Sequence, residues 1–483
     1  MNAPHHYKRT TRMIIFCAAV LLGLALARKV PPIPFWYVWL MAGIVLLNFR
    51  HSRITAVYLV FVFGLSVGWW RGGVYMAHVR FLTQLSREKV VVSGMALSDS
   101  TYNEKSQTSF MMGALRLIQP EGKPIIGKVE VSGYGEAMIY RGDHVTVSGK
   151  FYPARGSVVA YLSYANIDVT GRSKSFVYDI TRRFGAGLQN TLPEPLASFA
   201  MGILVGQRNT LPKDITTMLS AVGLSHIIAV SGYNMTILIR SGRKLFGKRS
   251  KFLIFLGSQT LIVGFLLATG MSASIVRAAI ISTLSLGAWY YGRTIKPLLI
   301  ILLAAAMTAL WNPLYIWSDI GWYLSFLAFF GVMILGPQVQ RRLFKERPRG
   351  LIGEMMSETL AAQIMTLPIV LYIFKTTSLM AVPANVLIVP LIPLAMLLSF
   401  FAGLAGMFIA PLAGWVAWPA RILLTYLIDM ATMFSRVPRM KLMVSLSVFG
   451  VAVLYAVLVL VLVILWRKNI RSAKITEVTT QIL

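Results

Sequence analysis

The chain has 483 residues, of which 56% are hydrophobic and only 13% are charged. Soluble globular proteins carry about 25% charged residues, so this composition excludes an ordinary soluble enzyme and a disordered chain. It predicts an integral membrane protein. Lysine and arginine outnumber aspartate and glutamate by 47 to 17, which gives a net charge of +30. Such an excess fits either a polyanionic partner or basic membrane loops.

The first part of the chain, residues 1–75, is predicted to form N-terminal transmembrane helices. Apolar stretches at 13–27, 35–49 and 54–70 approach the length of about 20 residues that a helix needs to cross a bilayer. The Ala25-Leu26-Ala27 triplet also fits a signal-peptidase site. Cleavage there leaves the later topology unchanged.

Residues 88–172 have a different composition, in which apolar and polar residues alternate between Gly, Ser and Pro. This alternation is typical of half-buried strands. Five short strands in a module of this size favour a β barrel of the OB type, and a generic five-stranded module fits as well. The five predicted strands are Lys89 to Gly94, Phe110 to Ile118, Lys128 to Gly133, His144 to Lys150 and Val158 to Val169.

Residues 196–466 are almost continuously apolar and are predicted to form a transmembrane domain, followed by a basic cytoplasmic tail at 467–483. With the first three stretches, the chain is predicted to cross the membrane about twelve times. A cytoplasmic N-terminus then places most loop arginines and lysines inside and the β module outside, as the positive-inside rule requires. The nine crossings predicted in this domain are 223–239, 252–269, 273–290, 297–312, 318–336, 355–374, 380–402, 411–433 and 444–466.

The positive charge lies mainly outside the β module, which has nine basic and eight acidic residues. Basic membrane loops therefore account for much of the excess without a nucleic acid. A DNA-binding face on the module would have to be local, with aromatic rings on which bases stack. The candidates are Lys105, Arg116, Lys128, Arg141 and Lys150, with Tyr102, Tyr134, Tyr140, Phe151 or Tyr152 as stacking surfaces.

Several polar residues lie within or beside apolar segments, where uncompensated polar groups are costly. His226, Ser231 and Asn234 fall in one such segment, which Gly232 interrupts. Broken helices at membrane depth normally line a cavity, so these residues are candidates for a path through the membrane. A hydrogen-bonded cluster that only holds helices together explains the same pattern.

Motifs for metal-dependent, redox or nucleotide-driven chemistry are missing from the sequence. The six histidines form no His-x-His or His-Glu-x-x-His pattern, and the single cysteine, Cys17, excludes a zinc site built on cysteines. We therefore predict no metal, no cofactor and no enzymatic activity.

The second half resembles the ComEC competence-protein family, membrane channels that pass single-stranded DNA into bacteria during natural transformation. The resemblance is carried by five motifs in the family's order, and Arg141-Gly142-Asp143-His144-Val145 resembles a strand of its OB-like module. The motifs are Gly223-Leu224-Ser225-His226 with Ala229 and Ser231-Gly232, Thr269-Gly270 with Ser274 and Arg277-Ala278, Tyr291-Gly292-Arg293, Asn312-Pro313 with Asp319, Gly321 and Leu324-Ser325-Phe326, and Gln363 with Leu367-Pro368 and Ala384-Asn385 to Pro390.

The sequence also departs from this family. Asn234 stands where the family commonly has His, and Tyr323 where it has Gln, which puts a proton-linked or amide role there in doubt. Many members end in a metallo-β-lactamase-like domain thought to degrade the non-transported strand. After Arg467 this chain has only a basic tail, so it resembles a short member without that domain.

The resemblance implies a DNA path through the plasma membrane. Arg277 would attract phosphates at the entrance, and His226, Ser231, Asn234, Gln363 and Asn385 would offer uncharged hydrogen bonds deeper in. Asp319 would pair with an arginine such as Arg277, and Ser325, Pro368 and Pro390 would shape the helices. The implied partners are single-stranded DNA, the lipid membrane, an extracytoplasmic DNA receptor, a cytoplasmic motor, single-strand-binding proteins and a separate nuclease.

Two other functions fit the same residues. In a transporter or exporter of another solute or polymer, the polar residues would form a site at the membrane midplane. In a membrane-embedded enzyme, His226 and Ser231 would form a catalytic pair, but the sequence places neither an orienting group nor an oxyanion donor beside them.

Overall fold

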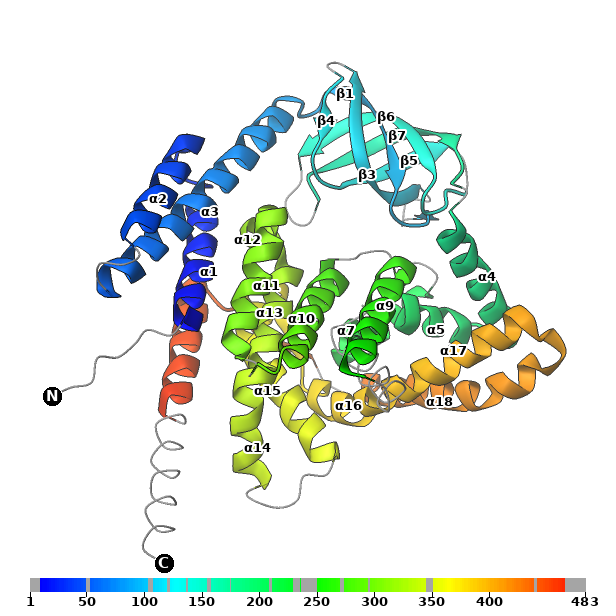
Figure 1. Ribbon diagram of the computed structural model, residues 1–483. Helices are drawn as coiled ribbons and strands as arrows, with labels where there is room; N and C mark the ends of the chain where they lie inside the picture. Colours follow the sequence, from blue (N-terminus) through cyan, green and yellow to red (C-terminus); the bar gives the residue numbers. More distant parts are fainter. Residues whose placement is uncertain are drawn as a thin grey trace, which may run out of the picture.

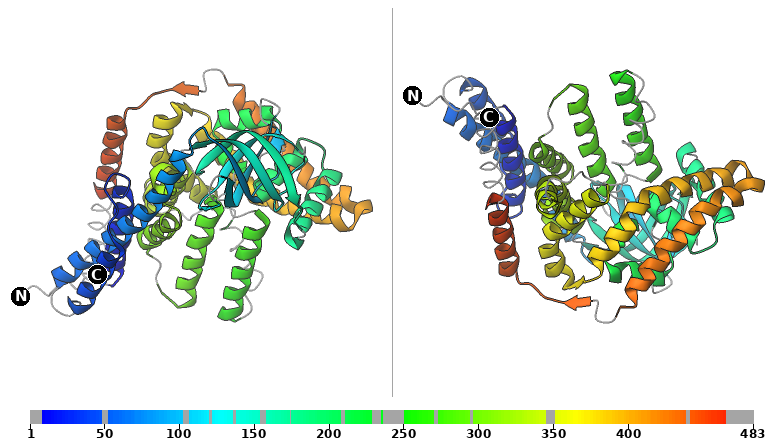
Figure 2. Two further views of the ribbon diagram at one scale, coloured as in Figure 1. Left: turned by 90° about the horizontal axis from the view of Figure 1, so that it is seen from above. Right: turned by 90° about the horizontal axis from the view of Figure 1, so that it is seen from below.

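A computed structural model of the protein is mostly helical and carries one β module (Figure 1). Seen from above, the module overlies part of the helices of the second half, and α1 and α2 lie to one side (Figure 2). The structure describes residues 9–48, 53–102, 107–119, 122–135, 138–153, 158–173, 175–207, 211–228, 235, 250–269, 273–293, 296–344, 351–437 and 441–464.

The first three helices are α1 (Arg9–Leu26), α2 (Phe35–Asn48) and α3 (Arg53–Gln84). Small residues let α1 and α3 approach closely, because a Cβ on Gly68 would lie 2.1 Å from the carbonyl oxygen of Val20. α3 is longer than the stretch at 54–70 predicted for it. Its last turns reach the β module and contribute Tyr75 and Leu82 to the module's core.

All five predicted strands are present, as β1 (Lys89–Ala96), β3 (Thr108–Gln119), β5 (Val129–Gly135), β6 (His144–Pro153) and β7 (Ala160–Gly171). Two further strands, β2 (Thr101–Tyr102) and β4 (Pro124–Ile125), pair with β3. The pairs β1–β3, β3–β5, β5–β7, β7–β6 and β6–β1 close a ring. Only β5–β7 is parallel among these five pairs.

The burial of alternate residues explains why these segments form strands. In β6, Val145 and Val147 are fully buried, whereas His144 is exposed and Thr146 and Ser148 are only half-buried. The other strands show the same alternation, and their inward-facing residues form one apolar core. The module therefore has its own hydrophobic centre, which the ends of α3 and α12 complete.

The second half begins with α4 (Phe176–Thr191), which continues from β7. The helices that follow are α5 (Leu196–Val205), α6 (Lys213–Val222), α7 (Ser225–Ile228), α9 (Lys251–Thr269), α10 (Ala273–Tyr290), α11 (Pro297–Trp311), α12 (Leu314–Ser318), α13 (Ile320–Phe330), the π-helical segment η1 (Gly331–Leu335), α14 (Gly336–Phe344), α15 (Leu351–Phe374), α16 (Ala381–Ile388), η2 (Val389–Leu391), α17 (Ile392–Phe408), η3 (Ala410–Leu412) and α18 (Ala413–Ser435).

The last described helix spans Val448–Ile464. The segment that leads into this helix is attached to the end of α15 by a small sheet. In this sheet β9 (Lys441–Met443) pairs with β8 (Thr376–Ser378). The hydroxyl of Tyr455 donates a hydrogen bond of 3.1 Å to the carbonyl oxygen of Met365, which holds this helix against α15.

Five helical stretches of the described residues are long and apolar enough to cross a membrane, which agrees with a membrane protein. They are Arg9–Leu26, Thr55–Gln84, Ile320–Arg342, Met356–Phe374 and Ala381–Phe408. Six shorter apolar helices accompany them. The predicted total of about twelve crossings and their orientation stay predictions, and most of the predicted crossing at 223–239 lies outside the described residues.

Candidate functional site

Arg277 occupies the second turn of α10 and is almost fully buried, with 3% of its surface exposed. Its Nη2 donates a hydrogen bond of 3.0 Å to the carbonyl oxygen of Gly321 in α13. Within the part of the chain that the structure describes, its Nε and Nη1 have no hydrogen-bond partner. A buried guanidinium with unused donors is expensive, so this side chain is suited to an anionic or carbonyl-bearing ligand.

Asp319 lies at the N-cap of α13 and is 8% exposed. Its Oδ1 accepts a hydrogen bond of 3.1 Å from the backbone N–H of Trp322, which satisfies one of the unpaired donors at the start of the helix. Asp319 lies within electrostatic range of Arg277, but the guanidinium donates its hydrogen bond to the carbonyl oxygen of Gly321. The carboxylate therefore caps the helix and acts on the arginine through space.

Two amide side chains of the predicted path are also left partly unsatisfied. Gln363 lies on α15 and Asn385 on α16, which packs against α15. The Oε1 of Gln363 and the Oδ1 of Asn385 are buried and accept no hydrogen bond from any residue that the structure describes. Sequence reasoning missed two similar groups, the hydroxyls of Ser258 on α9 and Ser399 on α17, which are buried without a partner as well.

The segment from His226 to Asn234 is described only in part. His226 lies on α7, which contacts α5 and α6, and its side chain is exposed. Ser231, Gly232 and Asn234 lie outside the described residues. No hydrogen bond among the described residues joins His226, Arg277, Gln363 and Asn385, which lie on four different helices.

The prolines of the second half have different effects. Pro368 is buried inside α15, and the helix continues through it. Pro390 lies in η2, the short 3₁₀ segment between α16 and α17, within the helical stretch Ala381–Phe408. Ser325 is half-buried on α13.

The β module exposes some of the predicted DNA-contact residues and buries another. Arg116 and Lys150 are exposed, and Tyr152 is half-buried. The predicted stacking role of Phe151 is wrong, because its ring is fully buried in the module's core. Neighbouring strands add a second lysine and a second tyrosine to the face around Lys150. Lys89 of β1 lies opposite Lys150, and Tyr161 of β7 lies opposite Tyr152. Lys105 lies outside the described residues.

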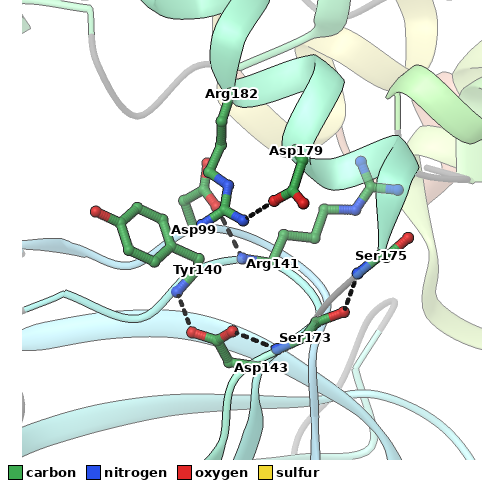
Figure 3. Close-up of polar contacts among 8 residues, drawn as sticks. All are labelled: Asp99, Tyr140, Arg141, Asp143, Ser173, Ser175, Asp179 and Arg182. Atoms are coloured by element: carbon green, nitrogen blue, oxygen red, sulfur yellow. Dashed lines mark hydrogen bonds and ion pairs between the residues drawn. The ribbon is translucent and has the colours of Figure 1, made fainter.

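The loop that carries Arg141 lies next to α4 (Figure 3). The Asp143 carboxylate accepts hydrogen bonds of 3.0 and 3.1 Å from the backbone N–H groups of Tyr140 and Ser173. The Arg141 guanidinium lies 5.0 Å from the ring centre of Tyr178 on α4, and its Nη2 donates to the carbonyl oxygen of Leu267 on α9. Arg141 thus joins the module to two helices.

A basic and aromatic cluster beside this loop was not predicted. Two guanidinium groups lie over the ring of Tyr140, with Arg182 at 5.0 Å and Arg172 at 5.9 Å from its centre. Arg182 also forms an ion pair with Asp179, one turn earlier on α4. The amphipathic run that begins at Phe176 was the available signal, since it places these charges on a helix next to the module.

Lys128 immediately precedes β5 and lies at the junction of the module with the membrane helices. Burial lowers the pKa of its ammonium group, the nearby positive charge of Arg141 lowers it further, and the Asp319 carboxylate opposes both. Lys128 of the module and Arg277 of α10 therefore both lie within electrostatic range of Asp319.

A family model described as "Competence protein" matches residues 203–469, more than half of the chain. The chain belongs to the Competence protein family. It is similar to ComE operon protein 3 of Bacillus subtilis (strain 168), with 26% identity over 276 residues, which are 54% of this chain and 34% of that protein. The match thus spans about a third of this relative's length. No solved structure matches the chain.

The family match confirms the resemblance predicted from the sequence motifs. The matched region includes Arg277, Asp319, Gln363 and Asn385, so the partly unsatisfied polar groups belong to the competence-type helices. The β module lies before this region, and its assignment depends on its strands alone.

Proposed function

We propose that this chain is a channel that carries single-stranded DNA across the plasma membrane into the cytoplasm during natural transformation. Membership of the Competence protein family supports a role in DNA uptake. The observation that carries the proposal is the set of buried polar atoms on apolar helices that have no partner among the described residues, at Ser258, Arg277, Gln363, Asn385 and Ser399.

These unsatisfied atoms fit a path for a hydrated polyanion. A helix bundle held together by polar contacts would pair such groups with one another, because buried polar groups normally have partners. A DNA strand needs donors and acceptors that exchange as it slides, with little fixed charge that would hold it. Uncharged amides and hydroxyls along the path, with a single arginine near its entrance, meet this requirement.

The β module is proposed to be an extracytoplasmic barrel of the OB type that receives the strand. Its ring order β1-β3-β5-β7-β6 and its parallel β5–β7 pair support this assignment. The outer face around Lys89, Lys150, Tyr152 and Tyr161 combines positive charge with aromatic rings. Such surfaces bind single strands through phosphate contacts and base stacking.

The proposed channel is not an enzyme and works with partners. The sequence offers no nucleotide-binding motif that would drive transport. A cytoplasmic motor or single-strand-binding proteins would therefore pull or trap the strand, an extracytoplasmic receptor would deliver it, and a separate nuclease would remove its complement. Twelve crossings with the module outside are the topology proposed for this arrangement.

The proposal is tested with Arg277→Ala and His226→Ala in cells that take up labelled DNA. Both variants, present at the normal level, are expected to lower the amount of DNA that reaches the cytoplasm while DNA binding at the cell surface stays intact. Lys213→Ala, at an exposed position that starts α6, is the matched control for loss of a positive charge. Normal uptake in both variants would remove these residues from the path.

A further inference from the structure

The composition of α3 changes at Arg71. The run from Ile54 to Trp70 contains no acidic residue, no basic residue and no histidine. It rises about 25 Å along the helix axis, which is close to the thickness of the hydrocarbon core of a bilayer. From Arg71 onward the helix also carries His78 and Arg80, and it rises about another 20 Å before it ends. Only the first part therefore has the length and composition of a segment embedded in lipid.

The second part of α3 is packed against the β module and not left for lipid (Figure 1). Tyr75 lies in the module's core, and Nε2 of His78 accepts a hydrogen bond of 3.0 Å from the backbone N–H of Ile126. Val74 is the large apolar side chain that stays exposed on this part. The last exposed side chains of the helix are polar, and they are Arg80, Thr83 and Gln84.

Two other helices meet α3 at the point where it changes. The ring of Trp70 lies 4.7 Å from that of Phe35, the first residue of α2. Nη2 of Arg71 donates a hydrogen bond of 3.1 Å to the carbonyl oxygen of Trp311, the last residue of α11. α12, which follows Trp311, packs with the module's core. The start of α2, the middle of α3 and the end of α11 are therefore held at one level.

The tryptophans at this level expose more than half of their surface, with 58% for Trp36, 66% for Trp39 and 82% for Trp311. Tryptophan is enriched where a membrane meets water, because its ring is apolar and its N–H is polar. Arg28 and Lys29 are exposed in the loop before α2 and add positive charge that suits lipid phosphates. The headgroup region of a bilayer matches both the exposed rings and the charge.

The surface on either side of these tryptophans favours lipid over a protein partner. Exposed apolar side chains continue from this level along α2 and the first part of α3, at Leu40, Tyr58 and Phe61. A protein interface would instead be closed by a polar rim on every side. A surface that is apolar on one side of an aromatic level and polar on the other has the profile of a bilayer boundary.

We infer that Trp36, Trp39 and Trp311 form an aromatic belt that binds phospholipid headgroups, and that α3 leaves the membrane at Arg71. From Arg71 to Gln84 the helix is then a stalk outside the lipid, and its far end holds the β module up to about 20 Å above the membrane surface. The inference divides the apolar stretch Thr55–Gln84 into a membrane segment and the stalk. It does not rest on the proposed function, since the membrane is the partner whatever the chain transports.

The experiment measures the depth of single nitroxide spin labels on the full chain in phospholipid nanodiscs. Oxygen concentrates in lipid and a nickel chelate stays in water, so the ratio of the two relaxation effects reports depth. Cys17, the only cysteine of the sequence, is replaced by alanine, and each variant carries one new cysteine at an exposed position. The variants are Phe61→Cys in the membrane segment, Trp36→Cys and Trp311→Cys in the belt, and Ala77→Cys and Arg80→Cys in the stalk.

We expect the ratio of oxygen to nickel relaxation to be highest at Phe61→Cys, intermediate at the two belt variants and lowest at the two stalk variants. A ratio at Ala77→Cys and Arg80→Cys as high as at Phe61→Cys would overturn the stalk, because α3 would stay in lipid to its end. Belt ratios as low as those of the stalk would overturn the belt and leave its rings to a protein partner. Lys29→Cys, exposed beside the belt, measures the same level if a tryptophan variant fails to fold.

Discussion

The crossing of α4 over α17 allows a graded test of how the β module is attached to the membrane helices. α4 continues directly from the module, and Gly187 on it contacts Gly403 and Gly406 on α17 through backbone atoms. A Cβ on Gly406 would lie 2.1 Å from the carbonyl oxygen of Gly187. Backbone atoms cannot rotate away as a side chain can, so Gly406→Ala must push the helices apart.

The size of the effect follows from the distances. Carbon and oxygen atoms in contact are normally about 3.3 Å apart, so Gly406→Ala requires a separation of about 1.2 Å. In Gly187→Ala the new Cβ would lie 2.7 Å from the carbonyl oxygen of Gly403, so this variant requires about half of that separation. Overpacking of this kind costs about 1–3 kcal/mol. We therefore expect Gly406→Ala to destabilise the protein more than Gly187→Ala.

The assay is the melting temperature of the purified chain in one detergent. Gly264→Ala is the matched control, because a Cβ at this position on α9 meets no atom within 4 Å. Alanine forms helices better than glycine, so the control is expected to melt at the normal temperature or above it. Equal melting temperatures for Gly406→Ala and Gly264→Ala would refute the close crossing of α4 and α17.

Three further predictions concern single side chains. Asn385→Leu removes a buried oxygen that accepts no hydrogen bond within the described ranges, so the melting temperature should stay equal or rise while DNA uptake falls. A lower melting temperature with normal uptake would contradict this. Trp317→Phe loses a hydrogen bond of 2.8 Å to the Leu24 carbonyl oxygen and should cost about 1 kcal/mol in thermal unfolding, whereas Trp36→Phe, at an exposed position, should cost nothing measurable. Burial and Arg141 lower the pKa of Lys128, so it loses its charge at a pH below the ordinary lysine value of about 10.4. Oligonucleotide affinity should therefore fall with rising pH in the unmodified chain before it does in Lys128→Arg, and identical pH profiles would refute this.

The sequence predicted the elements of the fold better than their junctions. The alternation of apolar and polar residues predicted all five long strands, because each strand has one face in the module's core. Pro390 was expected to shape its helix, and it lies in the 3₁₀ segment between α16 and α17, since proline cannot continue the hydrogen-bond pattern of an α-helix. The extension of α3 to Gln84 was missed, because its last turns are buried by the module and not by lipid.

The site residues show the same limit. Arg277 was named as one candidate partner of Asp319, but the hydrogen bond of Arg277 to Gly321 depends on how α10 and α13 pack. Lys128 was selected only as a possible surface contact of the module. Its electrostatic interaction with Asp319 depends on the docking of two regions far apart in the chain, which residue patterns do not encode. Phe151 was misplaced because aromatic residues suit both a strand's core and a stacking face.

Photo-crosslinking during uptake tests the proposed path most directly. A photoreactive amino acid is placed in turn at Arg277, Gln363 and Asn385, and at Leu397 and Trp415, whose apolar side chains are exposed on α17 and α18. We predict that incoming DNA is captured from the first three positions and not from the last two. Capture from Leu397 and Trp415 alone, or equal capture from all five, would contradict a DNA path along the buried polar groups.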